Sequence, residues 1–471
     1  MPNAGLHYLL HYLELTELAR RLHAKEISPV EATKAQLDRI EALDGALGSY
    51  ALVTPELAMQ QARAAEAEIQ RGQIRGPLHG VPIAVKDLCW TTGIDTAAGM
   101  TIHRRNKPAE DATVVRKLRE AGSVLLGKLQ LTEGAFADHH PNVKPPVNPW
   151  NKDHWSGASS SGSGVATAAG LCYGSLGSDT GGSIRFPSAA NGVTGLKPTW
   201  GRVSRYGVFE LAATLDHVGP MTRSAADAAA MLGAIAGPDP NDPTASQEAV
   251  PNYLAGIKRG LKGLRVGVDA AWNRHGVDAE TVRAVDEALT LVERLGGEVR
   301  AIRFPDPEPV IADWVSYCAI ETAVAHEGTY PARRGEYGPG LSGLIDIGRG
   351  LSAMDYQKMI LRRLDFRGRV AALFETIDLL VIPAQAFASP TIEKMATLGQ
   401  DPAMLAALLR FTCPFDMTGS PTITLPAGFT KTGTPIAFQF VAAHFAEDLL
   451  CRAGHAFQQA TDWHRQHPAL D

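Results

Sequence analysis

Hydrophobic and polar residues follow two different periods along this chain. Apolar side chains recur at helical spacing in residues 14–45 and 55–71, which predicts two amphipathic helices in the first segment and one in the second. The pair Ser28 and Pro29 is typical of a helix start. Short apolar runs bounded by Gly or Pro predict strands at 83–85, 124–126, 264–268, 379–382, 423–425 and 436–441. This alternation predicts an α/β fold in which helices cover both faces of a central, mixed, twisted sheet.

Two further segments carry predictions of their own. Residues 237–245 read GPDPNDPTA, a Pro- and Asp-rich sequence that predicts a surface loop. Residues 305–375 predict a helical stretch rich in aromatic rings. Ordinary helical packing is the first explanation for each ring, and a place beside a substrate is the second. The rings belong to Trp314, Tyr317, Tyr330, Tyr337, Phe366 and Phe374.

Composition indicates a compact enzyme that acts on small molecules. With 471 residues, 45% of them hydrophobic, the chain can bury a large core as one large domain or as two or three small ones. It shows no internal repeat and no linker long enough to separate domains. A net charge of −5 without a clustered basic stripe argues against nucleic acid as a partner.

The N-terminal residues and the cysteines both indicate a reducing compartment. The first residues, MPNAGLHYLLHYLEL, lack the basic region, apolar core and cleavage site of a signal peptide, and no apolar run approaches 18 residues. We therefore expect a cytoplasmic protein without a membrane span. The cysteines are odd in number and mostly lie in apolar segments, which predicts reduced core residues. They are Cys89, Cys172, Cys318, Cys413 and Cys451.

Two serine clusters, GASSSGS and DTGGS, hold the candidate chemistry. An amide carbon is a poor electrophile, so a serine that attacks it needs a base and N–H donors aimed at the developing oxyanion. Gly181 and Gly182 lack Cβ atoms, so the backbone can turn sharply and direct successive amides to one point beside the Ser183 hydroxyl. We expect Ser183 to be the nucleophile and the amides of Thr180, Gly181, Gly182 and Ser183 to form the oxyanion hole.

The base is predicted to be Lys86. None of the 15 histidines lies in a recognisable partner motif. Lys86 ends the apolar run 81–85, VPIAV, which predicts a buried strand, and burial disfavours the charged ammonium. Lowering a lysine pKa from about 10.4 to roughly 7 or 8 costs about 4 kcal/mol, which burial can provide. A serine of the first cluster can then relay a proton between Ser183 and Lys86.

These motifs resemble the amidase signature family, whose hallmark is a Gly- and Ser-rich segment that ends in D-[TI]-G-G-S-I-R, with a lysine upstream. The similarity extends through ISPVEATKAQLDRIEAL, GPLHGVPIAVKD, NPWN, GLKPTWGRVSRYG and PTITLPAGF, nearly the whole chain. The family spacing of 24 residues selects Ser159 as the bridging serine, which the resemblance places at a cis peptide. It implies Lys86 as base and Ser183 as the acyl-forming residue.

The resemblance also has consequences for the organisation of the chain. It implies one amidase signature domain over residues 1–471, with the signature core at about 75–225. In the family, the region equivalent to 305–375 is variable and covers the substrate entrance. No metal and no organic cofactor is implied.

The chain departs from the family pattern in ways that bear on the substrate. The usual GGSSGGS is GASSSGS here, which places Ala158, Ser161 and Ser163 in the loop, and the usual KDN is KDL. Leu88 should make the site drier, and Leu88, Ala158 and Ser160 are the candidate substrate-binding residues.

A second departure concerns transamidation subunits. These family members carry an acidic residue before an F-T-x-P segment, which holds the α-amino group of glutamine. That segment is LLRFTCP here, with Leu408, Leu409 and Arg410 in place of the acid.

Several polar groups have simpler explanations. Asp138, His139, His140 and His154 match no zinc spacing, so a polar loop near the entrance is expected. Neither GK[ST] nor GxGxxG follows the glycines as a phosphate site requires. Four further residues are expected to have structural roles: Asp179 accepts backbone N–H bonds, Arg185 anchors the loop that follows it, and Thr132 and Glu133 pack and form hydrogen bonds. Cys89 is not expected to be a nucleophile, because its motif has neither a basic neighbour nor a glycine nest.

The sequence thus predicts a hydrolase of carbon–nitrogen bonds in small to medium amides, with aryl amides, anilides and carbamates or urethanes favoured. The alternatives are the glutamine-hydrolysing subunit of a tRNA-dependent amidotransferase and a non-catalytic binding protein on the same scaffold. The expected partners are a small-molecule amide or carbamate and a second copy of the chain in a homodimer, with neither nucleic acid nor membrane.

Overall fold

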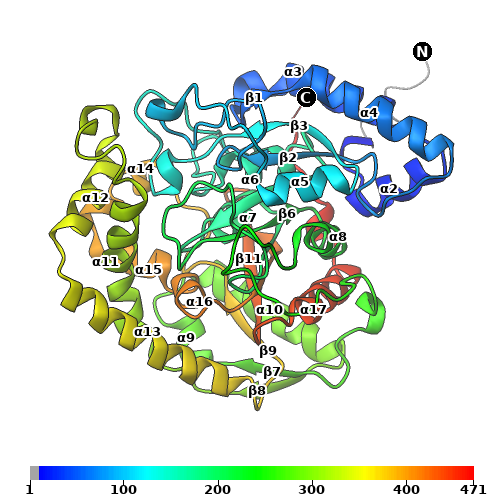
Figure 1. Ribbon diagram of the computed structural model, residues 1–471. Coiled ribbons are helices and arrows are strands. Elements are labelled where there is room, and N and C mark those ends of the chain that lie inside the picture. Colours follow the sequence, from blue (N-terminus) through cyan, green and yellow to red (C-terminus); the bar gives the residue numbers. More distant parts are fainter. Residues whose placement is uncertain (1–9, 471) are drawn as a thin grey trace.

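One sheet of eleven strands runs through the computed structural model, which describes residues 10–470 (Figure 1). The strand order is β1-β3-β2-β4-β6-β5-β10-β11-β9-β7-β8. The strands are β1 Tyr50–Val53, β2 Pro82–Lys86, β3 Val124–Leu129, β4 Gly174–Asp179, β5 Thr194–Lys197, β6 His217–Thr222, β7 Arg265–Val268, β8 Glu298–Ala301, β9 Leu379–Pro383, β10 Thr422–Phe429 and β11 Pro435–Ala442.

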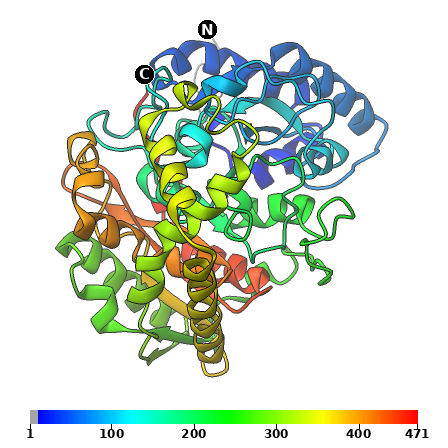
Figure 2. The same cartoon turned by 60° about the vertical axis from the view of Figure 1, so that its left-hand side comes forward.

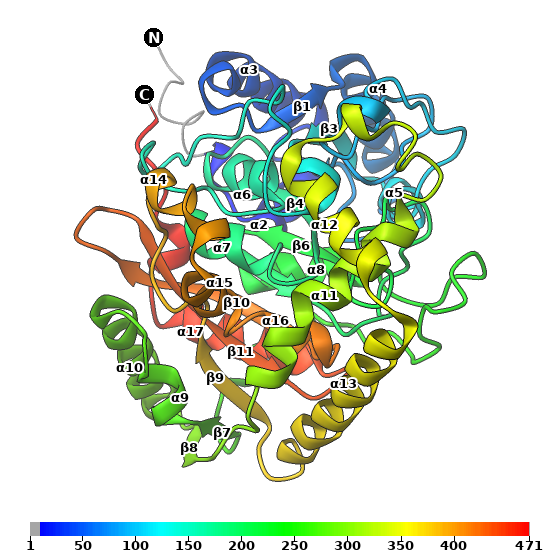
Figure 3. The same ribbon diagram turned by 90° about the vertical axis from the view of Figure 1, so that its left-hand side faces the viewer.

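The sheet is mixed, as predicted. Strand β2 lies between β3 and β4 and is parallel to both, and β7 is parallel to β8 and β9. The centre of the sheet, from β4 through β6, β5, β10 and β11 to β9, is antiparallel throughout. Figure 3 shows the sheet passing from the N-terminal elements at the top to β7 and β8 at the bottom.

Helices flank the sheet on both faces. The α-helices are α2 Leu15–His23, α3 Pro29–Leu47, α4 Pro55–Gln70, α5 Thr113–Glu120, α6 Ser161–Ala168, α7 Arg185–Asn191, α8 Ala225–Ile235, α9 Ala270–Arg274, α10 Ala279–Arg294, α11 Glu308–Ala325, α12 Pro339–Gly350, α13 Ala353–Leu373, α14 Ile392–Met395, α15 Pro402–Leu409, α16 Cys413–Met417 and α17 Glu447–Gln459. Short 3-10 turns are η1 Thr101–His103, η2 Glu133–Ala135, η3 Ile257–Arg259, η4 Arg334–Glu336, η5 Leu398–Gln400 and η6 Trp463–Arg465.

The three N-terminal helices and the six strands predicted from the sequence are confirmed. The start of α3 is a capping box, in which the Ser28 hydroxyl accepts from the Glu31 amide while the Glu31 carboxylate accepts from the Ser28 amide. Five strands were not predicted, namely β1, β4, β5, β6 and β8. Strand β4 reads GSLGSD, so it lacks the apolar run by which a buried strand is normally found.

The aromatic helical region forms α11, α12 and α13, which run along one side of the molecule (yellow-green in Figure 2). Tyr317, Tyr330, Tyr337 and Phe366 are buried, and they pack within hydrophobic clusters. Ordinary packing therefore explains these rings. Trp314 is buried as well, but it also lines a cavity that is described below.

The loop at 237–245 is less superficial than predicted. Asp239 and Asp242 within it are buried, and the Asp239 carboxylate accepts a hydrogen bond of 2.6 Å from the Ser204 hydroxyl. The aspartates thus tie the loop to the chain instead of leaving it solvated. All five cysteines are free thiols and buried.

The structure bears on the expectation about a membrane span but not on the one about a signal peptide. Within residues 10–470, no helix has the length and apolarity needed to cross a membrane. The expectation about a signal peptide rests mainly on residues 1–9, which lie outside the described residues.

Candidate active site

The sheet brings the predicted lysine and the predicted nucleophile turn to the same edge. Strands β2 and β4 are parallel neighbours, and Lys86 is the last residue of β2, while Asp179 is the last residue of β4. The carboxyl ends of parallel strands meet at one edge, where α/β proteins place their ligands. The turn 180–183, which follows β4, therefore lies beside Lys86.

Three serine hydroxyls surround the Lys86 ammonium nitrogen. Its Nζ lies 2.6 Å from Ser159 Oγ, 2.8 Å from Ser160 Oγ and 2.8 Å from Ser178 Oγ. Lys86 is fully buried, and burial lowers its pKa to about 7. The Ser160 hydroxyl already donates to the Ser178 carbonyl, so its proton is committed to the backbone. The Ser159 and Ser178 hydroxyls remain to exchange protons with the amine.

Ser159 and Ser183 belong to adjoining backbone segments. The peptide bond between Ala158 and Ser159 is cis, which confirms that expectation from the family resemblance. The Ser160 amide donates to the Ser183 carbonyl at 3.3 Å, which ties the two segments together. Ser183 is the only residue between 156 and 199 that is not buried. Ser183 is therefore the most accessible residue of this core segment.

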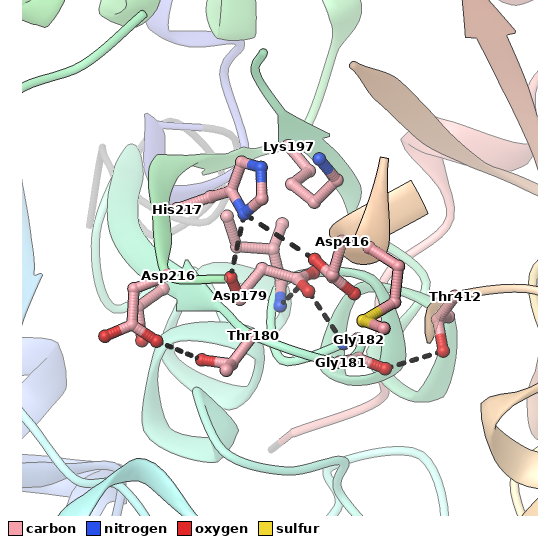
Figure 4. Close-up of polar contacts among 12 residues, drawn as sticks. Asp179, Thr180, Gly181, Gly182, Lys197, Asp216, His217, Thr412 and Asp416 are labelled. Carbon is pink, nitrogen blue, oxygen red and sulfur yellow. Dashed lines mark hydrogen bonds and ion pairs between the residues drawn. The ribbon is translucent and has the colours of Figure 1, made fainter. Parts of the chain in front are cut away.

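An ion cluster beneath the turn holds its shape (Figure 4). The Asp179 carboxylate accepts from the amides of Gly182 at 2.7 Å and Ile184 at 2.9 Å. Arg185 donates to Asp179, to the Asp416 carboxylate at 2.5 Å and to a backbone carbonyl at 2.7 Å. Both carboxylates and the guanidinium are fully buried. The structural role predicted for Asp179 is thus confirmed, whereas Arg185 anchors the distant 412–416 segment instead of the loop that follows it.

The two carboxylates of this cluster differ in their protonation. Burial alone would raise the pKa of Asp179, but the charge and hydrogen bonds of Arg185 hold it below its ordinary value. Burial raises the pKa of Asp416 well above its ordinary value, and the neighbouring Asp179 charge adds to the rise. The cluster therefore holds a firmly ionised Asp179 under the turn.

Replacing Arg185 by methionine is expected to destabilise the protein by about 3–5 kcal/mol, because it leaves the buried Asp179 charge uncompensated. Chemical denaturation of both proteins measures the difference. Arg369→Met is the matched control, since its ion pair with Asp365 is largely exposed and should cost no more than about 1 kcal/mol. Equal losses in the two variants would show that the buried cluster does not stabilise the fold.

A cavity of about 530 Å³ opens beside Ser183. Aromatic and aliphatic side chains make most of its wall, and α11, α14 and α15 each contribute lining residues. The lining residues are Ala135, Phe136, Ala137, Asp138, His139, His140, Pro141, Val143, Pro145, Pro146, His154, Trp155, Ser156, Ala158, Thr180, Gly181, Ser183, Phe186, Leu211, Trp314, Val315, Ile392, Met395, Ala396, Leu398, Leu405, Leu408 and Leu409.

The cavity offers little positive charge to a substrate. Neither lysine nor arginine is among its lining residues in the described chain. Burial lowers the pKa of His139 to about 4 and also lowers the pKa of His140, so both rings are neutral at pH 7. Asp138 is the one lining carboxylate within residues 10–470, and burial raises its pKa. A neutral or apolar ligand fits such a surface.

The predicted substrate-binding residues are placed differently from one another. Ala158 lines the cavity, but Leu88 and Ser160 do not. Leu88 lies in the turn that follows β2 and is packed in the main hydrophobic core. Ser160 contacts Lys86 and Ser178 instead of a ligand. These two assignments are therefore corrected.

The LLRFTCP segment contributes to the cavity in part. Leu408 and Leu409 line it where the transamidation subunits place an acid, whereas Arg410 turns away and donates to the Trp272 carbonyl at 2.7 Å. The expected polar loop around His139, His140 and His154 also lies at the cavity. Within residues 10–470, no three His, Cys, Asp or Glu side chains gather closely enough to hold a metal.

Sequence reasoning missed four distant side chains that hold the DTGG segment or the Arg185 guanidinium beneath it. These are Trp314 from α11, His217 from β6, and Thr412 and Asp416 from the segment around α16. No local motif marks them, because they lie far from the turn in sequence. Burial raises the pKa of the Cys89 thiol to about 11, in keeping with its predicted lack of reactivity.

Known protein sequences match this one over nearly its whole length. The family model "Amidase" matches residues 31–451. The chain is 52% identical to a Mycobacterium tuberculosis protein named "Putative amidase AmiD", over 97% of this chain and 96% of that protein. It is 38% identical to a glutamyl-tRNA(Gln) amidotransferase chain of Geobacter sp., over 96% of this chain and 98% of that one.

A solved structure gives the same result for the fold. The native peptide amidase of Stenotrophomonas maltophilia aligns with a TM-score of 0.84 at 29% identity, covering 97% of this chain and 98% of that one. The family match, the relatives and the shared architecture agree with the resemblance found in the motifs, and the chain belongs to the amidase family.

Proposed function

We propose that this protein hydrolyses the carbon–nitrogen bond of small to medium uncharged amides through a Ser183 acyl-enzyme. One observation carries the proposal: Lys86, buried with a pKa of about 7, lies 2.6 Å from Ser159, next to a half-buried Ser183 that opens into an apolar cavity. A serine nucleophile needs a neutral base at neutral pH, and burial supplies one here.

The proposed reaction has two halves. Ser183 Oγ attacks the amide carbon and its proton passes through Ser159 to the neutral Lys86 amine, while the carbonyl oxygen becomes an oxyanion. The ammonium then returns the proton through Ser159 to the departing amine as the carbon–nitrogen bond breaks. Water attacks the acyl-enzyme by the same relay and releases the acid with Ser183 restored.

The amides of Thr180, Gly181, Gly182 and Ser183 remain the proposed oxyanion hole. The Gly182 amide also donates to Asp179 at 2.7 Å, which fixes the turn from below. The amides of Gly181 and Ser183 have no hydrogen-bond acceptor among the described residues, so they are available to an oxyanion.

The cavity favours an apolar or aryl group on the substrate. The rings of Phe136, Trp155, Phe186 and Trp314 line it, and Leu408 and Leu409 add aliphatic surface. We propose aryl amides and anilides as the preferred substrates. Aryl carbamates and urethanes present the same carbonyl geometry and belong to the same proposal.

The similarity to the Geobacter amidotransferase chain keeps glutamine as a second candidate substrate. The cavity does not favour it. The glutamine α-carboxylate would find no lysine or arginine among the described lining residues, and its α-amino group would meet Leu408 or Leu409 if it bound as in the transamidation subunits.

We also propose a domain organisation, an oligomeric state and a cellular location for the protein. One continuous sheet supports a single domain over residues 1–471. A homodimer in the cytoplasm that binds neither nucleic acid nor membranes completes the proposal. Light scattering after size exclusion measures the oligomeric state directly.

The test is a hydrolysis screen of the purified chain against p-nitroanilides, anilides, aryl carbamates and glutamine, with Ser183→Ala as the control. We expect turnover of aryl substrates with kcat/KM at least about 100-fold above glutamine, because burying an unpaired charge in an apolar cavity costs several kcal/mol. Turnover of glutamine alone, or of nothing until partner subunits are added, would favour the amidotransferase function. No turnover of any substrate, with or without partner subunits, and no covalent labelling of Ser183 would favour the non-catalytic scaffold, whereas equal activity in Ser183→Ala would place the nucleophile elsewhere.

A further inference from the structure

Three successive backbone carbonyls of the DTGG turn are held by donors from elsewhere in the fold. His217 Nδ1 lies 3.2 Å from the Asp179 carbonyl, and the Thr412 hydroxyl donates to the Gly181 carbonyl at 2.6 Å (Figure 4). The Trp314 indole N–H donates to the Thr180 carbonyl at 2.9 Å. These donors come from β6, from the segment before α16 and from α11, so three separate elements converge on one turn.

A held carbonyl fixes the direction of the next amide. The peptide unit is planar and trans, so the C=O of one residue and the N–H of the following residue point in opposite directions. The Trp314 indole therefore directs the Gly181 N–H away from α11. In the same way, Thr412 directs the Gly182 N–H, which donates to Asp179.

Trp314 acts on one of the two turn amides that are free to bind the oxyanion. The Gly181 N–H has no acceptor among the described residues, whereas the Gly182 N–H is already engaged by Asp179. The Trp314 ring also packs directly on the turn, because a Cβ at Gly181 would lie 2.3 Å from the Trp314 Cζ2 atom. Indole and glycine thus fit each other closely, and the amide has little freedom to rotate.

We infer that Trp314 is a positioning residue for the oxyanion hole, acting through the Thr180 carbonyl on the Gly181 amide. The inference rests on the function proposed above. Donors that stabilise an oxyanion work because they are oriented before charge develops. Loss of the indole N–H should leave substrate binding largely intact and weaken the stabilisation of the tetrahedral intermediate.

The test compares Trp314→Phe with the unmodified protein, using an anilide substrate and an aryl trifluoromethyl ketone. The ketone carbon accepts Ser183 Oγ, the serine proton passes to Lys86, and the ketone oxygen becomes an oxyanion. We expect kcat to fall about 10- to 100-fold, less than for removal of an oxyanion donor itself, with KM changed less than about threefold. Ketone affinity should fall by the same factor as kcat, while affinity for the carboxylic acid product stays within about twofold.

Trp272→Phe is the matched control. Trp272 is 8% exposed and Trp314 is 7% exposed, but the Trp272 indole N–H has no hydrogen-bond partner in the described chain and the ring is not part of the cavity wall. Its replacement should leave kcat and ketone affinity unchanged. Incorporation of 3-benzothienylalanine at Trp314 keeps the bicyclic shape and lacks the N–H, so it serves if the phenylalanine variant fails to fold.

The outcomes separate this inference from the proposed function. An active wild-type chain whose Trp314 variants keep kcat and ketone affinity within twofold would overturn the inference alone. A parallel fall in ketone and product affinity would also overturn it, because it would indicate lost packing. A wild-type chain that hydrolyses no amide, or whose activity survives Ser183→Ala, would overturn the function itself.

Discussion

Replacing Ser183 by alanine is expected to lower kcat about ten-thousandfold or more while the protein keeps its fold. The hydroxyl is the group that forms the acyl-enzyme in the proposed reaction, and a nucleophile removed from such a relay leaves only the contribution of binding and the oxyanion hole. Steady-state kinetics on an anilide measure the loss. Intact mass spectrometry with a fluorophosphonate probe should show one adduct on the wild-type protein and none on the variant.

Ser342→Ala is the control for this prediction. Ser342 is a buried serine in α12, outside the cavity, whose hydroxyl donates only to the Pro339 carbonyl. Its replacement should change kcat less than twofold. Labelling that persists in Ser183→Ala would place the nucleophile elsewhere and contradict the acyl-enzyme scheme.

Lys86→Met should lower kcat/KM about 10²- to 10⁴-fold, the usual contribution of a general base. Methionine fills a similar buried volume and offers no lone pair of comparable basicity. The pH profile gives a second signature. Only neutral lysine can accept a proton, so with a pKa of about 7 the wild-type kcat/KM should rise about tenfold per pH unit below pH 7 and level off above it.

A second buried lysine provides a control for the pH prediction made for Lys86. Burial also lowers the pKa of Lys197 to about 7, but among residues 10–470 its ammonium group donates only to the Pro198 carbonyl, and it lies outside the cavity wall. The acidic limb should vanish in Lys86→Met and persist in Lys197→Met. The opposite result would assign the titration, and with it the base, to Lys197.

The fold was predictable wherever apolar runs mark a strand, and it was hidden where small residues form the sheet. Strands β2, β3, β9, β10 and β11 are rich in branched aliphatic side chains and were found. Strand β6 reads HVGPMT, and a Cβ at its Gly219 would lie 2.2 Å from the Leu196 carbonyl oxygen. The neighbouring strands β4, β5 and β6 carry small residues where backbones pack closely, so their apolar runs are too short to mark them as strands.

The site was predictable to the extent that it is local. Lys86, Ser159 and Ser183 stand in motifs of a few residues each, and the structure brings the first two into direct contact. Trp314 lies 134 residues from the carbonyl that it holds, and no motif around it marks that contact. Leu88 was assigned to the site because it is two residues from Lys86, but β2 ends at Lys86 and the alternation of a strand does not continue through the turn that follows.

The anchoring of the nucleophile turn has a consequence for the order in which the protein is made. Arg185 and Asp416 are 231 residues apart, as are Gly181 and Thr412. At about 5–20 residues per second, a ribosome needs about 10–50 s to pass from one partner to the other. During that interval a nascent chain holds the whole Lys86–Ser159–Ser183 set without the segment that braces it. Competence for chemistry should therefore arise late in translation, when the 412–416 segment docks.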